Sequence, residues 1–211
     1  MRVLITGFGP FPGAPFNPSA TLAKALARRR RPAFAALDRT VHIFATTYGS
    51  VDRELPKLLA QKPDIVLMFG VAGRRRQLCV ETRARNALSV LFPDAGAYRP
   101  QQSAINRGKP PALTGNAPFA RLLGAARTRI RASRLSRDAG RYLCNYLYWR
   151  GLEHLRQDGP LVQFIHIPPV SNKARRRGGK KQHALSLAQL VNGAEAILIA
   201  LMVASLAASR N

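Results

Sequence analysis

The sequence predicts an α/β protein whose strands form a parallel sheet. Three short apolar runs, at residues 2–6, 40–46 and 64–70, are typical of buried strands, and helix signals lie between them. Strands that alternate with helices at this spacing pair in parallel through right-handed crossovers. The chain has 211 residues and is 46% apolar, which suits one domain with its own core and excludes a disordered chain.

Local signals mark the elements in the first third of the chain. The first strand ends at Gly7, and the helix after it begins at Asn17-Pro18-Ser19 and runs to about residue 30. Ser50 is expected to cap a second helix, which ends near residue 61 because Pro63 follows.

The remaining two thirds of the chain alternate between regular elements and loops. Residues 92–115 are rich in Pro, Gly, Gln and Ala, and such a long irregular loop is typical of a functional lid. The basic, Gly-containing segment 171–183 is expected to be a mobile loop. The other expected elements are an edge strand at 77–86, a basic helix at 117–131, a short strand at 132–137, a helix ending near 156, a strand at 161–167 and a terminal helix within 185–208.

The chain is strongly basic. It has 34 Lys and Arg residues against 10 Asp and Glu residues, which gives a formal net charge of +24 and attracts nucleic acid or acidic surfaces. The arginines are scattered along the predicted helices, aromatic residues are not interleaved with them, and no recognised nucleic-acid motif accompanies them. This pattern favours solvated helix faces over a nucleic-acid site.

Three features bear on the compartment and on metals. The two cysteines, Cys79 and Cys144, make no disulfide framework, which favours a reducing cytoplasm. The apolar N-terminal run is too short for a signal peptide, and polar residues interrupt the run at 185–208, so a helix packed on the core is favoured over a membrane span. The cysteines are not in a CxxC pattern and the histidines lack metal-ligand spacing, so no metal site is expected.

Cys144 is the first candidate for chemistry. It lies in the first turn of a predicted helix, where free backbone N–H groups and the helix dipole favour a thiolate, which is the nucleophilic form. The alternative is a buried structural cysteine, because a free Cys often behaves as a small apolar residue. His166 lies near the carboxyl end of an apolar strand, where parallel sheets present catalytic groups, although a core histidine fits the same position. With Glu81, these residues could form a nucleophile, a base and an orienting acid.

Two loops follow carboxyl ends of predicted strands, where α/β proteins bind ligands. Gly7 to Phe16 holds three phenylalanines among Gly and Pro, which suits the wall of an apolar pocket or a loop pinned to the core. Val71-Ala72-Gly73 suits a backbone wall for a ligand or an ordinary tight turn.

Four blocks of sequence match, in order along nearly the whole chain, the motifs of one known family. The blocks are Val3 to Phe11 with Asn17-Pro18-Ser19, then Pro63-Asp64-Ile65-Val66 with Gly70-x-Ala72-Gly73-Arg74, Glu81 and Asn86, then Ala139-Gly140-x-x-x-Cys144-Asn145, and Phe164-Ile165-His166-Ile167-Pro168. In these blocks the chain resembles pyroglutamyl peptidase I.

The resemblance implies a single α/β/α sandwich domain over residues 1–211, built around a twisted, mostly parallel sheet. It implies a cysteine omega-peptidase that removes N-terminal pyroglutamyl residues from peptides without metal or cofactor, and a homodimer or homotetramer. Cys144 would be the nucleophile, His166 the general base and acid, and Glu81 the group that orients the imidazole. Phe8 and Phe11 would line the lactam pocket, with Phe16 as a neighbour, and Asn17 would hold the loop or the substrate.

The chain departs from the family pattern at several positions. Val71 replaces the usual Gln, so substrate contact there would have to run through the backbone. Tyr142 stands where Phe is common and adds a hydroxyl to the pocket wall. Arg74-Arg75-Arg76 is bulkier and more charged than usual, and residues 168–173 lack the typical acidic and aromatic character. Two rival functions stay open on these grounds: a feeble family member that binds another small amide, and a basic nucleic-acid-binding protein on the same fold.

Overall fold

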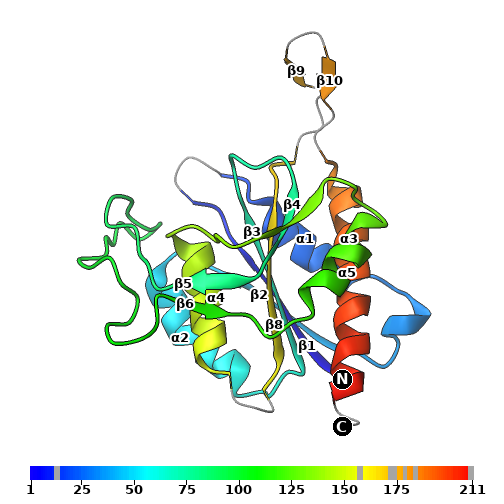
Figure 1. Cartoon of the computed structure of the whole chain (residues 1–211), viewed down its shortest axis with the longest axis horizontal. Coiled ribbons are helices and arrows are strands. Elements are labelled where there is room, and N and C mark those ends of the chain that lie inside the picture. Colours follow the sequence, from blue (N-terminus) through cyan, green and yellow to red (C-terminus); the bar gives the residue numbers. More distant parts are fainter. Residues whose placement is uncertain (12–14, 156–158, 171–174, 178–179, 183–184, 209–211) are drawn as a thin grey trace.

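A six-stranded sheet, in the order β2-β1-β3-β8-β4-β7, lies between two layers of helices (Figure 1). The structure is a computed structural model, and it describes residues 1–11, 15–155, 159–170, 175–177, 180–182 and 185–208. The strands of this sheet are β1 (Arg2–Phe8), β2 (Asp38–Phe44), β3 (Ile65–Val71), β4 (Leu78–Glu81), β7 (Ser133–Ser136) and β8 (Leu161–Ile167).

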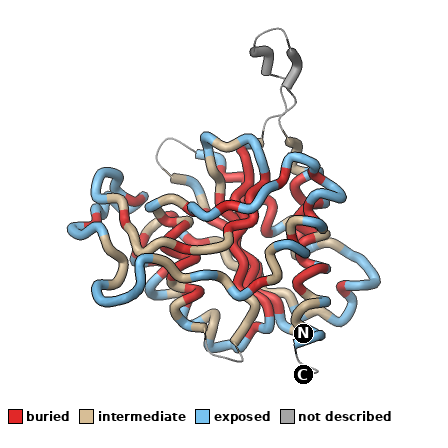
Figure 2. The backbone as a smooth tube through the Cα atoms, viewed as in Figure 1, coloured by how far each residue is buried: buried red, intermediate tan, exposed pale blue. Residues whose placement is uncertain are grey.

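Five α-helices flank the sheet, three packed on one face and two on the other. They are α1 (Pro18–Ala27), α2 (Tyr48–Leu59), α3 (Phe119–Arg127), α4 (Leu143–Glu153) and α5 (Leu187–Ala208), with a short 3-10 helix, η1 (Pro32–Phe34). Residues of α1, α3 and α5 share one buried apolar cluster, and residues of α2 and α4 share the other. The sheet and the inner sides of the helices are accordingly the most buried parts of the chain (Figure 2).

Strand alternation divides the sheet residues between these two clusters. Ile65, Leu67 and Phe69 of β3 pack toward α1, α3 and α5, whereas Val66 and Met68 pack toward α2 and α4. The other strands follow the same period of two, because successive side chains of a strand point to opposite faces. The face to which a residue at the carboxyl end of a strand points therefore follows from its position, because residues two apart in a strand share a face.

The prediction of an α/β domain with a mostly parallel sheet is confirmed. β1 pairs in parallel with β2 and β3, and β3 pairs in parallel with β8. β8 has the predicted bounds, and the other predicted helices and strands begin or end within a few residues of the predicted positions. The terminal run forms α5, which is the one helix in the described part of the chain long and apolar enough to cross a membrane, and it packs against α1 and α3 as a core helix does.

Two local predictions are wrong. The strand expected at an edge is β4, an inner strand whose four residues are all buried; it pairs antiparallel with β8 and parallel with β7. Its shortness and the arginine-rich turn before it disguise its buried position. The cap of α2 is Thr47 and not Ser50: the Thr47 hydroxyl accepts a bond from the backbone N–H of Ser50, one turn inside the helix.

The two predicted loops have short strands of their own. The long excursion after β5 (Arg83–Arg85) has no helix or strand until β6 (Ala112–Thr114), which pairs with β5. In the segment 171–183, β9 (Arg175–Arg177) and β10 (Lys180–Gln182) pair as an antiparallel hairpin that projects from the body (Figure 1). The rest of that segment lies outside the described residues, so its mobility stays a prediction.

Candidate active site

Cys144 is the second residue of α4, in the first turn of the helix as predicted. No side chain caps this helix end, because the N-cap residue Tyr142 makes no capping bond. The first backbone N–H groups of a helix have no partner within the helix, so they are suited to bond a group held beside the thiol.

Gly70, near the end of β3, makes room for this thiol. A Cβ atom added to Gly70 would lie 2.6 Å from the Sγ of Cys144 and 2.8 Å from the nearest ring atom of Phe164. Both distances are far below ordinary contact, so the sulfur rests directly against the bare Cα of this glycine. An isolated glycine at the end of an apolar strand is a known sign of such a close approach, and this signal was available in the sequence.

The register of β3 and β8 puts His166 next to Gly70, against which the Cys144 sulfur lies. Gly70 and His166 are register partners on the adjacent parallel strands β3 and β8, where neighbouring chains lie about 4.8 Å apart. Phe164 of β8 packs toward α2 and α4, so His166, two residues further along, points to that same face. Since α4 carries Cys144 across this face, the thiol and the imidazole share one side of the sheet at neighbouring positions.

Glu81 reaches His166 from the last position of β4. The Nδ1 atom of His166 lies 2.8 Å from Oε1 of Glu81, and both side chains are almost fully buried. Two further bonds fix the backbone at this point, since the carbonyl of Glu81 accepts from the hydroxyl of Tyr148 and from the amide of Gln163. The predicted orienting acid is therefore in hydrogen-bond contact with the predicted base.

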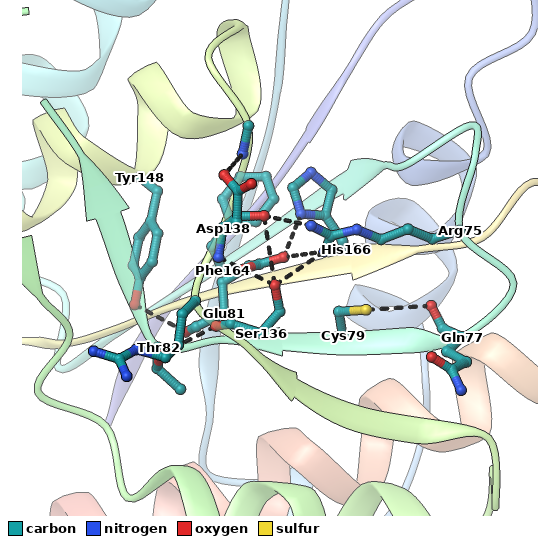
Figure 3. A network of polar contacts seen from close by, with 12 residues as sticks. Arg75, Gln77, Cys79, Glu81, Thr82, Ser136, Asp138, Tyr148, Phe164 and His166 are labelled. Atoms are coloured by element: carbon teal, nitrogen blue, oxygen red, sulfur yellow. Dashed lines mark hydrogen bonds and ion pairs between the residues drawn. The ribbon is translucent and has the colours of Figure 1, made fainter. Parts of the chain in front are cut away.

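A polar network surrounds this pair (Figure 3). Arg75, in the turn between β3 and β4, donates to Oε1 of Glu81 at 2.5 Å and to the hydroxyl of Ser136 at 3.2 Å. Its other terminal nitrogen donates to the carbonyl of Asp138. Sequence reasoning marked Arg75 only as an unusual charge, because the acceptors come from β4, β7 and the segment before α4, which nothing in the sequence links to it.

The electrostatics of the site differ from the expectation for the thiol. Burial, followed by the charge of Glu81, raises the pKa of Cys144 to about 12, while the charge of Arg75 and a backbone hydrogen bond act in the opposite sense. The position of Cys144 at the helix end predicted a thiolate, but the raised pKa favours the protonated thiol. The thiol therefore needs a base to take its proton. For Glu81, burial would raise the pKa, but the bond and charge of His166, then Ser136 and then Arg75, bring the pKa below its usual value.

The predicted pocket residues are not all brought together. Phe8, at the carboxyl end of β1, is buried against Phe44 in the same apolar cluster that Cys144 and Tyr142 border. Phe11 is half-buried, and Phe16 is 61% exposed and is not part of that cluster. The structure thus brings Phe8 and Tyr142 to the apolar cluster beside the thiol and leaves Phe16 outside it.

Asn17 and Tyr142 act on the loops that flank the site. The Asn17 side chain accepts from the backbone N–H of Ser19 as the cap of α1, and its amide donates to the carbonyl of Gly9 at 3.0 Å. The Tyr142 hydroxyl donates to the carbonyl of Pro93 at 2.8 Å, a bond that a phenylalanine could not make. Asn17 thus ties the predicted pocket loop to the start of α1, and Tyr142 ties the predicted lid loop to the start of α4.

Val71 turns away from the thiol. Its side chain packs against the cluster formed with α1, α3 and α5, on the opposite face of the sheet from Cys144. Only its backbone lies at the carboxyl end of β3 beside Gly70, so the backbone is the part of Val71 open to a substrate on the Cys144 face.

A separate hollow of about 690 Å³ lies between the start of α2, the 88–107 segment and Tyr146. None of Cys144, His166 and Glu81 lines it. Across the described residues, no group of three or more His, Cys, Asp or Glu side chains is arranged to hold a metal ion.

Comparison with known proteins gives a consistent result. The family model described as "Pyroglutamyl peptidase" matches residues 1–205. Pyrrolidone-carboxylate peptidase of Gloeobacter violaceus is 31% identical over 94% of this chain and 95% of its own, and that of Pyrococcus furiosus is 30% identical over 97% and 98%. Among solved structures, pyroglutamyl peptidase I of Bacillus amyloliquefaciens has a TM-score of 0.80 at 26% identity, covering 96% of this chain and 97% of its own.

Proposed function

The chain belongs to the pyroglutamyl peptidase family, a family of cysteine-type peptidases, and on that premise we propose that it hydrolyses the bond after an N-terminal pyroglutamyl residue with Cys144, His166 and Glu81 as its triad. The observation that carries this assignment is the position of the Cys144 sulfur against Gly70, the register partner of His166, whose imidazole in turn contacts Glu81.

The first half of the reaction follows from this arrangement. The Nδ1–H of His166 donates to Glu81, which leaves Nε2 as the acceptor for the thiol proton. The Cys144 sulfur attacks the pyroglutamyl carbonyl carbon as its proton passes to His166, and the raised pKa of the thiol makes this transfer necessary. The imidazolium then gives the proton to the departing amine, so the peptide leaves and a thioester remains.

Water completes the cycle. His166 takes a proton from a water molecule, the hydroxide attacks the thioester, and the returning proton restores the thiol as pyroglutamate leaves. The uncapped backbone N–H groups at the start of α4 are suitable donors to the oxyanion in both halves. Glu81 keeps the imidazole in one tautomer and stabilises its charged form.

Selection of the lactam ring is proposed to rest on an apolar wall and on backbone groups. Phe8, Phe11 and Tyr142 supply the wall, and backbone groups of Val71 bond the lactam N–H or C=O. A prolyl residue lacks the lactam carbonyl and would leave such a group unpaired, which disfavours it. Asn17 acts on the loop through Gly9, and the exposed Phe16 contributes, if at all, at the rim.

The test is turnover of a fluorogenic pyroglutamyl amide. We expect thiol-sensitive turnover in the wild type and none in Cys144→Ala. Cys79→Ala removes the other thiol, which is also a contact of Arg75, and its remaining turnover should still be stopped by a thiol reagent. Glu81→Gln should lose less activity than His166→Ala, because an orienting group contributes less than the base itself. Equal turnover in the wild type and in Cys144→Ala would reject the nucleophile. For localisation, we expect the protein to be found in soluble form in the cytoplasm.

A further inference from the structure

We propose that Arg75 is a positioning residue of this site, which holds Glu81 in the place and charge state that the imidazole needs. The inference deepens the proposed function and rests on it. Arg75 belongs to the arginine triplet 74–76, which the sequence marks only as extra charge, and its neighbour Arg74 is exposed in the same turn.

The geometry of Arg75 is that of a clamp and not of a surface arginine. Its side chain is 22% exposed, and its guanidinium reaches acceptors from three separate segments: Oε1 of Glu81, the hydroxyl of Ser136 and the carbonyl of Asp138. A planar guanidinium with five donors can serve three acceptors at once, whereas a lysine ammonium is a single point of charge. The clamp therefore holds the same oxygen of the Glu81 carboxylate that the imidazole contacts (Figure 3).

Arg75 and His166 share one carboxylate oxygen. Both donate to Oε1 of Glu81, at 2.5 Å and 2.8 Å, and the Glu81 side chain is 0% exposed. A buried carboxylate without a cation has a raised pKa, because ionisation in a dry site is costly. The charge of His166 also lowers the Glu81 pKa, but His166 has to be neutral to accept the thiol proton. At that stage Arg75 is the cation beside Glu81 that keeps the pKa of the carboxyl low.

The charge of Arg75 also reaches the thiol. Glu81 disfavours the Cys144 thiolate and Arg75 favours it, so the two charges offset each other at the sulfur. Three other ionisable groups act on this cluster: Cys79 from β4 on Arg75, Tyr142 before α4 on Cys144, and Tyr148 from α4 on Glu81. None of the three is a cation. At the alkaline pH where the thiol titrates, loss of Arg75 therefore leaves the charge of Glu81 unopposed at the sulfur.

Arg75→Met is the main variant, and Arg74→Met is its matched control, with the same charge removed from the same turn. We expect Arg75→Met to lower kcat about tenfold to hundredfold, the scale for a residue that holds an active-site group through a hydrogen bond, with KM within about twofold. Arg75→Lys should recover part of kcat, because the charge stays but the three-way fork is lost. Arg74→Met should match the wild type.

A second measurement reads the site without any substrate. The rate of chloroacetamide alkylation at Cys144, followed by peptide mass spectrometry against pH, reports thiolate formation. Arg75→Met should move this profile to higher pH by about one unit, because the charge of Glu81 is no longer offset, and Arg74→Met should leave it in place. If the wild type fails to hydrolyse pyroglutamyl amides, the proposed function fails, whereas this series still tests Arg75.

The last test asks whether Arg75 acts through Glu81. In the Glu81→Gln background the further change Arg75→Met should cost less than half as much in log kcat as it does in the wild type, since the partner charge is already gone. The double variant buries no lone charge, so it serves where Arg75→Met alone fails to fold. An unshifted alkylation profile in folded Arg75→Met, a change in KM in place of kcat, or an equal cost in both backgrounds would overturn the proposal.

Discussion

Gly70→Ala tests the placement of the thiol most directly. The added methyl would lie 2.6 Å from the Cys144 sulfur and 2.8 Å from a ring atom of Phe164, whereas ordinary contact is about 3.5 to 4.0 Å. The sulfur must therefore retreat by about 1 Å, and the Phe164 ring by a similar amount. Overpacking of this kind costs about 1 to 3 kcal/mol of the free energy of unfolding, which leaves a folded protein to assay.

The kinetic cost of that shift is larger than the cost in stability. Displacing a reacting atom by about 1 Å lowers the rate about a hundredfold, so kcat/KM for a pyroglutamyl amide should fall by this factor in Gly70→Ala. Gly73→Ala is the matched control, because a Cβ at Gly73 would meet nothing within 4 Å and the substitution lies in the next turn of chain.

The assay pairs turnover with the midpoint of urea unfolding for both glycine variants. We expect Gly73→Ala to match the wild type in both, and Gly70→Ala to stay folded with the large loss in kcat/KM. If Gly70→Ala turned over the substrate at the wild-type rate, the reasoning would be refuted, because the sulfur would then not react from its position against β3.

Three further predictions concern residues around the site. Tyr142→Phe should cost about 0.5 to 1.5 kcal/mol in the free energy of unfolding, measured in urea, because it removes the hydroxyl bond to the carbonyl of Pro93. Asn17→Ala should cost about 1 kcal/mol through loss of the α1 cap, and limited proteolysis should cut the loop after Gly9 faster. Glu81 has a folded pKa below its unfolded value, so its contribution to stability is present above the unfolded pKa and is lost as the pH falls through the folded one. Between pH 5 and 3, the free energy of unfolding of the wild type, measured in urea, should therefore fall more steeply than that of Glu81→Gln.

The sequence was sufficient for the elements whose signal is local. The strand at Leu161–Ile167 and the start of the Cys144 helix are set by apolar runs and by small residues at their ends, and both lie where predicted. β4 was misplaced because an inner strand of four residues has too few positions to display a pattern. Its burial depends on β7 and β8, which pair with it from more than 50 residues away.

The site was predictable to the extent that its residues carry motifs. Cys144, His166 and Glu81 were named from their places in the predicted elements, and the family resemblance supplied their roles. The contact between Glu81 and His166 spans 85 residues, and no spacing rule could have given it. Arg75 escaped for the same reason, since its three acceptors belong to segments that only folding brings together. Gly70 could have been singled out, because a glycine that ends an apolar strand leaves a space that something else must fill.

The period of two along the strands explains why the chemistry gathers on one face. Gly70 has the parity of Val66 and Met68, and His166 has the parity of Val162 and Phe164, all of which pack toward α2 and α4. Val71 has the opposite parity, so the position where the family commonly has Gln cannot bring its side chain to the thiol in this chain without a one-residue slip. Such a slip in β3 would also turn Gly70 to the other face. The replacement by Val is therefore compatible with an intact Cys144–His166–Glu81 site, and any cost to substrate binding has to come through the Val71 backbone.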